Sequence, residues 1–94
     1  MQIQVNSDKN IALDAAVIHW IGIKAERSLK RFSRRLTRVE VHLSDVNSRK
    51  FGTHDKRCLI EARPAGHRAV TARHSAATVN LAVGGALTSS SGFA

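Results

Sequence analysis

Residues 38–44, with the sequence RVEVHLS, alternate charged or polar side chains with apolar ones. Successive side chains of a strand point to opposite faces of a sheet, so this alternation predicts a half-buried antiparallel strand. Its inward face carries Val39, Val41 and Leu43, and its outward face is charged. The segments on either side of this strand must therefore supply the rest of a sheet and a cover for its apolar face.

Further strand patterns follow residues 38–44. Residues 45–56, DVNSRKFGTHDK, are polar and contain a glycine, which predicts a long hairpin connection. Residues 57–63, RCLIEAR, alternate again and predict another strand. Its inward side chains are those of Cys58, Ile60 and Ala62. Residues 64–68, PAGHR, predict a turn, and residues 69–73, AVTAR, predict a third strand of this series.

A strand and a helix are expected before this series. Residues 2–5, QIQV, predict a short strand with Ile3 and Val5 facing the core. Asp14 is placed to cap a helix that carries residues 15–32, because its carboxylate can accept the free amide hydrogens of the first turn. At about 100° per residue, the apolar side chains of this helix fall on one broad arc. They are Val17, Ile18, Trp20, Ile21, Ala25, Leu29 and Phe32.

The opposite side of the same helix is basic. Its outward positions are His19, Arg27, Lys30, Arg31 and Arg34. Lys24 lies inside the apolar arc and Ile23 on the polar side, so neither residue fits this division. An exposed tryptophan can stack on a base, but the place of Trp20 on the apolar arc assigns it to the core.

The chain after His74 contains no lysine, arginine, aspartate or glutamate. Residues 75–87 predict a second helix with Ser75 as its cap, although two adjacent glycines weaken it. Residues 88–94, TSSSGFA, predict a disordered tail.

The predicted order is strand, helix, three strands and helix. This order indicates an α+β fold, β-α-β-β-β-α, in which a four-stranded antiparallel sheet carries both helices on one face. The chain has 94 residues, which is enough for one domain, here residues 1–87, and too few for a second.

The charge of the chain favours a polyanionic partner. Fifteen lysines and arginines against seven aspartates and glutamates give a net charge of +8. Ten of the fifteen are arginines, whose planar guanidinium suits phosphate recognition, and such an excess attracts nucleic acid at long range. The single cysteine fits a reducing compartment, and neither a signal peptide nor a membrane-spanning stretch is evident. We therefore expect a soluble cytoplasmic protein.

Seven of the cations lie between Lys24 and Arg38, opposed only by Glu26. A merely solvated helix face usually intersperses both signs, so this imbalance favours a site for phosphate groups. A second basic group flanks the predicted hairpin connection and comprises Arg49, Lys50, Lys56 and Arg57. For this second group, phosphate contacts and an ordinary solvated loop are equally good interpretations.

Nothing in the sequence indicates an enzyme. The five histidines have no spacing typical of metal ligands, and Cys58 lies between apolar neighbours, as a buried structural thiol does. Paired carboxylates, a nucleophile elbow and a glycine-rich phosphate loop are all lacking from the sequence. The charges on the outward sheet face predict cross-strand pairs of opposite sign. We therefore expect no catalytic residues, no metal and no cofactor.

The predicted order of elements, together with LTRVEVHLSDVNSRKFGTHDKRCLIEARPAGHRAVTARHSAATVNLAVGGAL of residues 36–87, resembles the ribosome hibernation promoting factor family, most closely its short form. The resemblance covers residues 1 to about 87. Its members are also called ribosome-associated inhibitors or sigma-54 modulation proteins. The resemblance implies a fold similar to double-stranded-RNA-binding domains. It also implies a stress-response protein that binds ribosomal RNA in the mRNA and tRNA channel of the small ribosomal subunit, and so silences translation by occlusion.

The resemblance further implies which residues contact RNA. These are the cations of the first helix and its exit: Lys24, Arg27, Lys30, Arg31, Arg34 and Arg35. Relatives commonly carry a charged segment similar to DKLxRxL after a stretch like AVGGA, whereas here Leu87 is followed by TSSSGFA. The first helix is therefore expected to be the principal RNA contact.

Two other functions fit the same residues. One is a general binder of structured RNA without preference for the ribosome. The other is a module that associates with itself through a sheet edge or through the uncharged C-terminal segment, with the charge serving only solubility.

Overall fold

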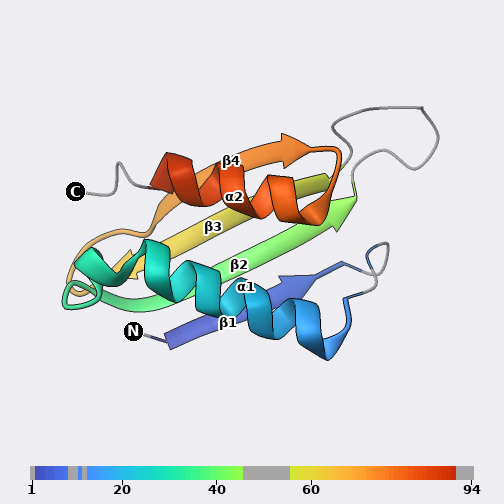
Figure 1. Ribbon diagram of the computed structural model, residues 1–94. Coiled ribbons are helices and arrows are strands. Elements are labelled where there is room, and N and C mark those ends of the chain that lie inside the picture. Colours follow the sequence, from blue (N-terminus) through green and yellow to red (C-terminus); the bar gives the residue numbers. More distant parts are fainter. Residues whose placement is uncertain (1, 9–10, 12, 46–55, 91–94) are drawn as a thin grey trace.

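Two helices cover the same face of a four-stranded sheet (Figure 1). The computed structural model describes residues 2–8, 11, 13–45 and 56–90. The elements in chain order are β1 (Gln2–Ser7), α1 (Ala15–Ser28), the 3₁₀ turn η1 (Lys30–Phe32), β2 (Leu36–Asp45), β3 (Lys56–Pro64), β4 (Val70–Ala76) and α2 (Val79–Ser90). The order β-α-β-β-β-α and the α+β class predicted from the sequence are confirmed.

The sheet is mixed, so the expectation of a fully antiparallel sheet is wrong at β1. The strand order is β1-β2-β3-β4, and β1 pairs parallel to β2 with Ile3 opposite Val39. The pairs β2–β3 and β3–β4 are antiparallel, as hairpin connections require. The helix α1 carries the chain back across the sheet between β1 and β2, and this crossover makes the two strands parallel.

The core lies between the sheet and the helices. The predicted inward residues of β2 and β3 are almost fully buried, with Val39, Cys58 and Ile60 at 0% exposure. One narrow line of apolar side chains from α1 and its C-cap packs into this core. It comprises Ile21, Ala25 and Leu29, which are spaced four residues apart. The buried core side chains of the described residues are all aliphatic or the cysteine.

The start of α1 follows the sequence prediction and its end does not. The Asp14 carboxylate accepts a hydrogen bond from the Val17 backbone N–H at 2.8 Å, which confirms the predicted cap. The α-helix ends at Ser28 rather than continuing through residue 32. The buried Leu29 leaves helical geometry at ψ 8°, and one 3₁₀ turn leads the chain down toward β2.

The second helix begins later and ends later than predicted. Ser75 belongs to β4, and the hydroxyl of Thr78 accepts the hydrogen bond from the Leu81 N–H at 3.2 Å instead. The helix then continues through Ser90, so residues 88–90, which the sequence assigned to a tail, are helical. Residues 91–94 lie outside the described part of the chain.

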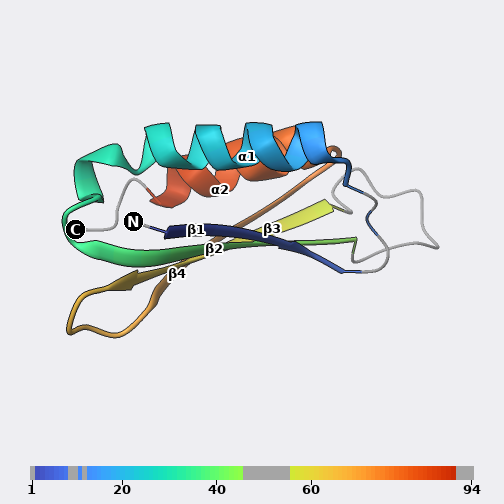
Figure 2. The same cartoon turned by 90° about the horizontal axis from the view of Figure 1, so that it is seen from below.

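Helix α2 packs over β3 and β4, while α1 packs beside β1. Ala82, Val83 and Ala86 of α2 are fully buried against the sheet. Figure 2 shows the helices on one side of the sheet and the other sheet face without a covering element. The molecule therefore offers two different surfaces, a helical one and an open sheet face.

Candidate nucleic-acid interface

The six cations that the sequence singled out lie along the second half of α1, in η1 and in the turn before β2. We call them the α1 basic strip, and they are Lys24, Arg27, Lys30, Arg31, Arg34 and Arg35. Five of the six are exposed and Lys24 is half-buried. Because the α-helix ends at Ser28, the strip is not one continuous helical face, and the sequence prediction of such a face is wrong beyond that residue.

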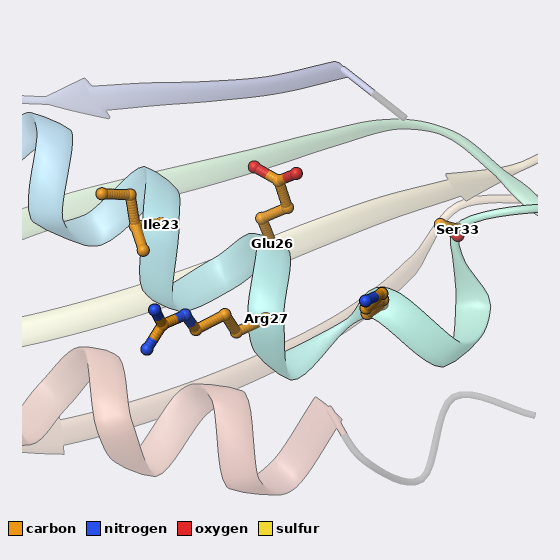
Figure 3. A pocket seen from close by; sticks show the side chains of 5 residues that line it. Ile23, Glu26, Arg27 and Ser33 are labelled. Atoms are coloured by element: carbon orange, nitrogen blue, oxygen red, sulfur yellow. The ribbon is translucent and has the colours of Figure 1, made fainter.

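The cations of this strip have few negative partners. Among the residues that the structure describes, no carboxylate forms an ion pair with Arg27, Lys30 or Arg34. The one acidic residue of the region, Glu26, points its carboxylate in a different direction from the Arg27 guanidinium (Figure 3). Arg27, Lys30 and Arg34 therefore keep their charge available for an anionic partner.

The middle of the strip borders a hollow beside α1. The hollow holds about 460 Å³ and lies between the helix and the turn that follows it. It is lined by Ile23, Glu26, Arg27, Lys30 and Ser33 (Figure 3). Arg27 and Lys30 can bind phosphate groups of an RNA backbone. Such phosphate contacts position a protein on RNA but do not read its sequence.

Trp20 and Lys24 lie together on the surface of α1, and the assignment of Trp20 to the core is wrong. Trp20 is 36% exposed, and the Lys24 Nζ lies 5.3 Å from the centroid of its ring. The apolar arc is wider than the line that contacts the sheet, so Trp20 and Ile18 stay outside the core. The contact with the indole explains why a lysine is tolerated inside the apolar arc, since the Lys24 ammonium group lies over the Trp20 ring.

The end of the strip meets the connection between β3 and β4. Arg34 and Arg35 line a hollow of about 600 Å³ together with His67 and Arg68. The Ala65 N–H donates a hydrogen bond of 2.8 Å to the Arg35 carbonyl, which ties the two segments together. The structure thus adds Arg68 to the cationic surface, with the His67 side chain lining the same hollow.

Sequence reasoning missed these two residues, although a signal for them exists. Leu36 of β2 pairs with Pro64 of β3, so the start of one strand lies beside the end of the next. Residues just before β2 and just after β3 must then meet at that end of the sheet. Cations in both segments predict a joint cluster once the two strands are paired.

The second basic group is weaker than the sequence suggested. Arg49 and Lys50 lie outside the described residues. Lys56 forms a salt bridge of 2.8 Å with Asp45, which offsets its charge. Arg57 is exposed on the open sheet face, at the far end of the strand from Arg63.

The open sheet face neutralises much of its own charge. Arg63 lies 2.7 Å from Glu61 and 4.0 Å from Glu40, and Arg38 lies 3.2 Å from Glu40. The register places Arg38 opposite Arg63 and Glu40 opposite Glu61, so the ion pairs run along strands and diagonally rather than directly across. This face offers less net attraction to an anion than the α1 basic strip does.

Cys58 is fully buried, and desolvation raises the pKa of its thiol to about 12. A thiol with this pKa is protonated at neutral pH and is a poor nucleophile.

Within residues 2–8, 11, 13–45 and 56–90, no three His, Cys, Asp or Glu side chains are arranged to hold a metal ion. The described helices are also too short or too polar to cross a membrane.

The comparisons with known proteins concern the fold. No protein-family model matches the sequence, and no curated protein matches it. Among solved structures, the chain is similar to the N-terminal domain of Thermus thermophilus protein Y, with a TM-score of 0.68 and 21% identity over 94% of this chain and 89% of that one. It is also similar to a ribosomal subunit interface protein from Coxiella burnetii, with a TM-score of 0.68 and 13% identity over 94% of this chain and 87% of that one. The chain has the fold of these two proteins.

Proposed function

We propose that the protein is a ribosome-associated hibernation factor that binds small-subunit ribosomal RNA in the mRNA and tRNA channel and silences translation by steric occlusion. One observation carries the proposal. The exposed cations Arg27, Lys30 and Arg34 have no carboxylate partner among the described residues. Arg27 and Lys30 line one hollow beside α1, and Arg34 lines a second one at the end of the strip. The fold shared with protein Y and with a ribosomal subunit interface protein supports the ribosome as the partner.

In this proposal residues 1–87 form the binding unit, and the six cations of the α1 basic strip contact phosphates of the RNA. Arg68 extends the contact at the end of the sheet, where it joins Arg34 and Arg35. The chain acts as a cytoplasmic protein without catalysis and without a cofactor, since occlusion needs only occupancy. Helix α2 carries no charged residue, so phosphate contacts come from α1 and the turns at its end.

Sedimentation of cell extract through a density gradient tests the proposal. The protein is expected to migrate with small subunits or whole ribosomes at low salt, and to leave them as salt rises, because each neutralised phosphate releases counterion. A competing RNA duplex in excess should not displace it. If the duplex competes as well as ribosomes do, the protein is a general binder of structured RNA. If it migrates alone as an oligomer, self-association is the function.

A further inference from the structure

Trp20 is the single tryptophan of the chain, and it lies beside Lys24 of the α1 basic strip. It borders a hollow of about 320 Å³, at the low end of the roughly 300–1,000 Å³ typical of small-molecule sites. The hollow is lined by Trp20, Ile23, Lys24, Arg27 and Ser28. An exposed aromatic ring thus shares a cavity with two cations.

The charges of this hollow suit one nucleotide. None of its lining side chains is a carboxylate, and neither Lys24 nor Arg27 pairs with a carboxylate of the described residues. The acidic residues nearest to Trp20 in the sequence are Asp14 and Glu26, and neither lines this hollow. Asp14 is engaged as the cap of α1 and shares a second hollow with Trp20, and Glu26 lines the hollow beside Arg27 and Lys30. A planar ring beside two free cations complements a base and its phosphate.

Lys24 now occupies one face of the indole, with its Nζ 5.3 Å from the ring centroid. A cation–π contact at an exposed site is weaker than the stacking of a base on an aromatic side chain. A base can therefore displace the ammonium group from the ring. The displaced Lys24 remains in the same hollow, where its charge is free to meet the phosphate of that nucleotide.

Helix α2 leaves room on the other side of Lys24. The groove between the helices is lined by Lys24, Ser28, Gly84, Leu87 and Thr88, without an acidic group. A Cβ added at Gly84 would meet no atom within 4 Å, so this wall of the groove is open. The uncharged second helix thus presents no repulsion to a nucleotide that approaches along α1.

We propose that Trp20 is a stacking platform for an unpaired nucleobase of RNA, and that Lys24 and Arg27 hold the phosphate of the same nucleotide. The inference rests on the proposed function and adds the class of ligand that α1 takes. A base inside a duplex has both faces covered by its neighbours, so only an unpaired or extruded base can stack here. The protein then recognises more than the shape of the RNA backbone.

Intrinsic fluorescence tests this directly, because the chain has no other tryptophan. The probes are a short single-stranded oligouridylate and inorganic polyphosphate of similar charge, with binding followed independently by sedimentation. Both are expected to bind at low salt, but only the oligouridylate should quench Trp20, since polyphosphate has no base to stack. Binding of the oligouridylate without quenching, or equal quenching by both probes, would overturn the inference.

Variants separate stacking from charge. Trp20→Ala is expected to weaken oligouridylate binding about tenfold, a typical cost of losing one stacked base, while Trp20→Phe keeps most of it. Polyphosphate binding should not change in either variant. Ile23→Ala is the matched control, because Ile23 lines the same hollow and is 40% exposed but cannot stack. An equal loss in Ile23→Ala and Trp20→Ala would contradict the stacking role.

Salt dependence gives a second readout. Trp20→Ala should leave the slope of log affinity against log salt unchanged, whereas Lys24→Gln should reduce it by about 0.7, the contribution of one phosphate contact on a single strand. The proposed function can stand while this inference fails, if Trp20→Ala sediments with ribosomes as the wild type does and the oligouridylate binds the wild type without quenching Trp20. If the wild-type protein does not sediment with ribosomes at low salt, the proposed function itself is refuted.

Discussion

Gly85 of α2 lies close against the His74 side chain of β4. A Cβ at this position would lie 2.0 Å from Cδ2 of the His74 ring, far inside normal contact distance, whereas a Cβ at Gly84 would meet no atom within 4 Å. The two neighbouring glycines of α2 therefore lie in different surroundings, one open and one crowded. Gly85 allows a close approach, and Gly84 only lowers helix propensity.

Alanine at each glycine tests this difference. Gly85→Ala is expected to lower the free energy of unfolding by about 1–3 kcal/mol, the usual range for overpacking. Gly84→Ala should raise it by about 1 kcal/mol through helix propensity. Urea unfolding measures both, and His74→Ala combined with Gly85→Ala should recover most of the loss. Equal effects of the two single alanines would show that the His74 ring swings aside without cost.

Cys58 carries the clearest pH dependence of a single side chain. Burial raises the pKa of its thiol from 9.0 to about 12, so the folded state favours the protonated form. This contribution to stability is fully present below pH 9 and is lost as the pH rises toward 12. At pH 8 iodoacetamide should label the native protein far more slowly than the urea-unfolded chain. Equal labelling rates would mean that the thiol is accessible in the folded state.

At the scale of elements, the cap of α1 supports the helix that bears the basic strip. Asp14→Ala removes the acceptor for the Val17 N–H and is expected to cost about 1 kcal/mol of stability. Asp14→Asn keeps a cap of similar strength, so it should cost much less. Thermal or urea unfolding followed by circular dichroism measures both. An asparagine variant as unstable as the alanine variant would contradict the capping role.

The elements that the sequence predicted well are those with a strict period. The alternation in residues 38–44 and 57–63 placed Val39, Val41 and Ile60 correctly, because one face of each strand is buried under helices and the other is open. Because side chains alternate between the two faces of a strand, assigning the strand also assigns which side chains face the core. The two antiparallel pairs followed from the same patterns and from the turns between them.

The elements that it predicted poorly depend on contacts far apart in the chain. Nothing local marks the end of α1 at Ser28, since the helical spacing of buried side chains continues from Ala25 to Leu29. Trp20 lies on the apolar arc but is exposed. The fully buried residues of the arc are Ile21, Ala25 and Leu29, and Val17 and Phe32 are partly buried against the core. The meeting of Arg34 with Arg68 required the pairing of β2 with β3, which places their two turns at one end.

At the scale of the whole molecule, the charge is distributed unequally between two faces. The open sheet face pairs Arg38 and Arg63 with glutamates. On the helical side and at the end of the sheet, no such ion pair within the described part of the chain involves Arg27, Lys30, Arg34 or Arg68. Long-range attraction of RNA follows from the total charge, but the orientation in which RNA binds follows from this distribution. We therefore predict that the positions of the cations, rather than the net charge alone, determine how tightly the protein binds RNA.

Two matched charge reversals measure this most directly. Lys30→Glu with Arg34→Glu changes the α1 basic strip, and Arg57→Glu with Arg73→Glu changes exposed positions of the open sheet face by the same net charge. The affinity of each variant for purified small ribosomal subunits is measured across a salt series. We predict that the first pair loses at least tenfold in affinity and lowers the salt slope by about 1.4–1.8, the release expected for two phosphate contacts, while the second pair changes little. Equal losses in the two variants, or an affinity of the wild type that does not depend on salt, would contradict the account.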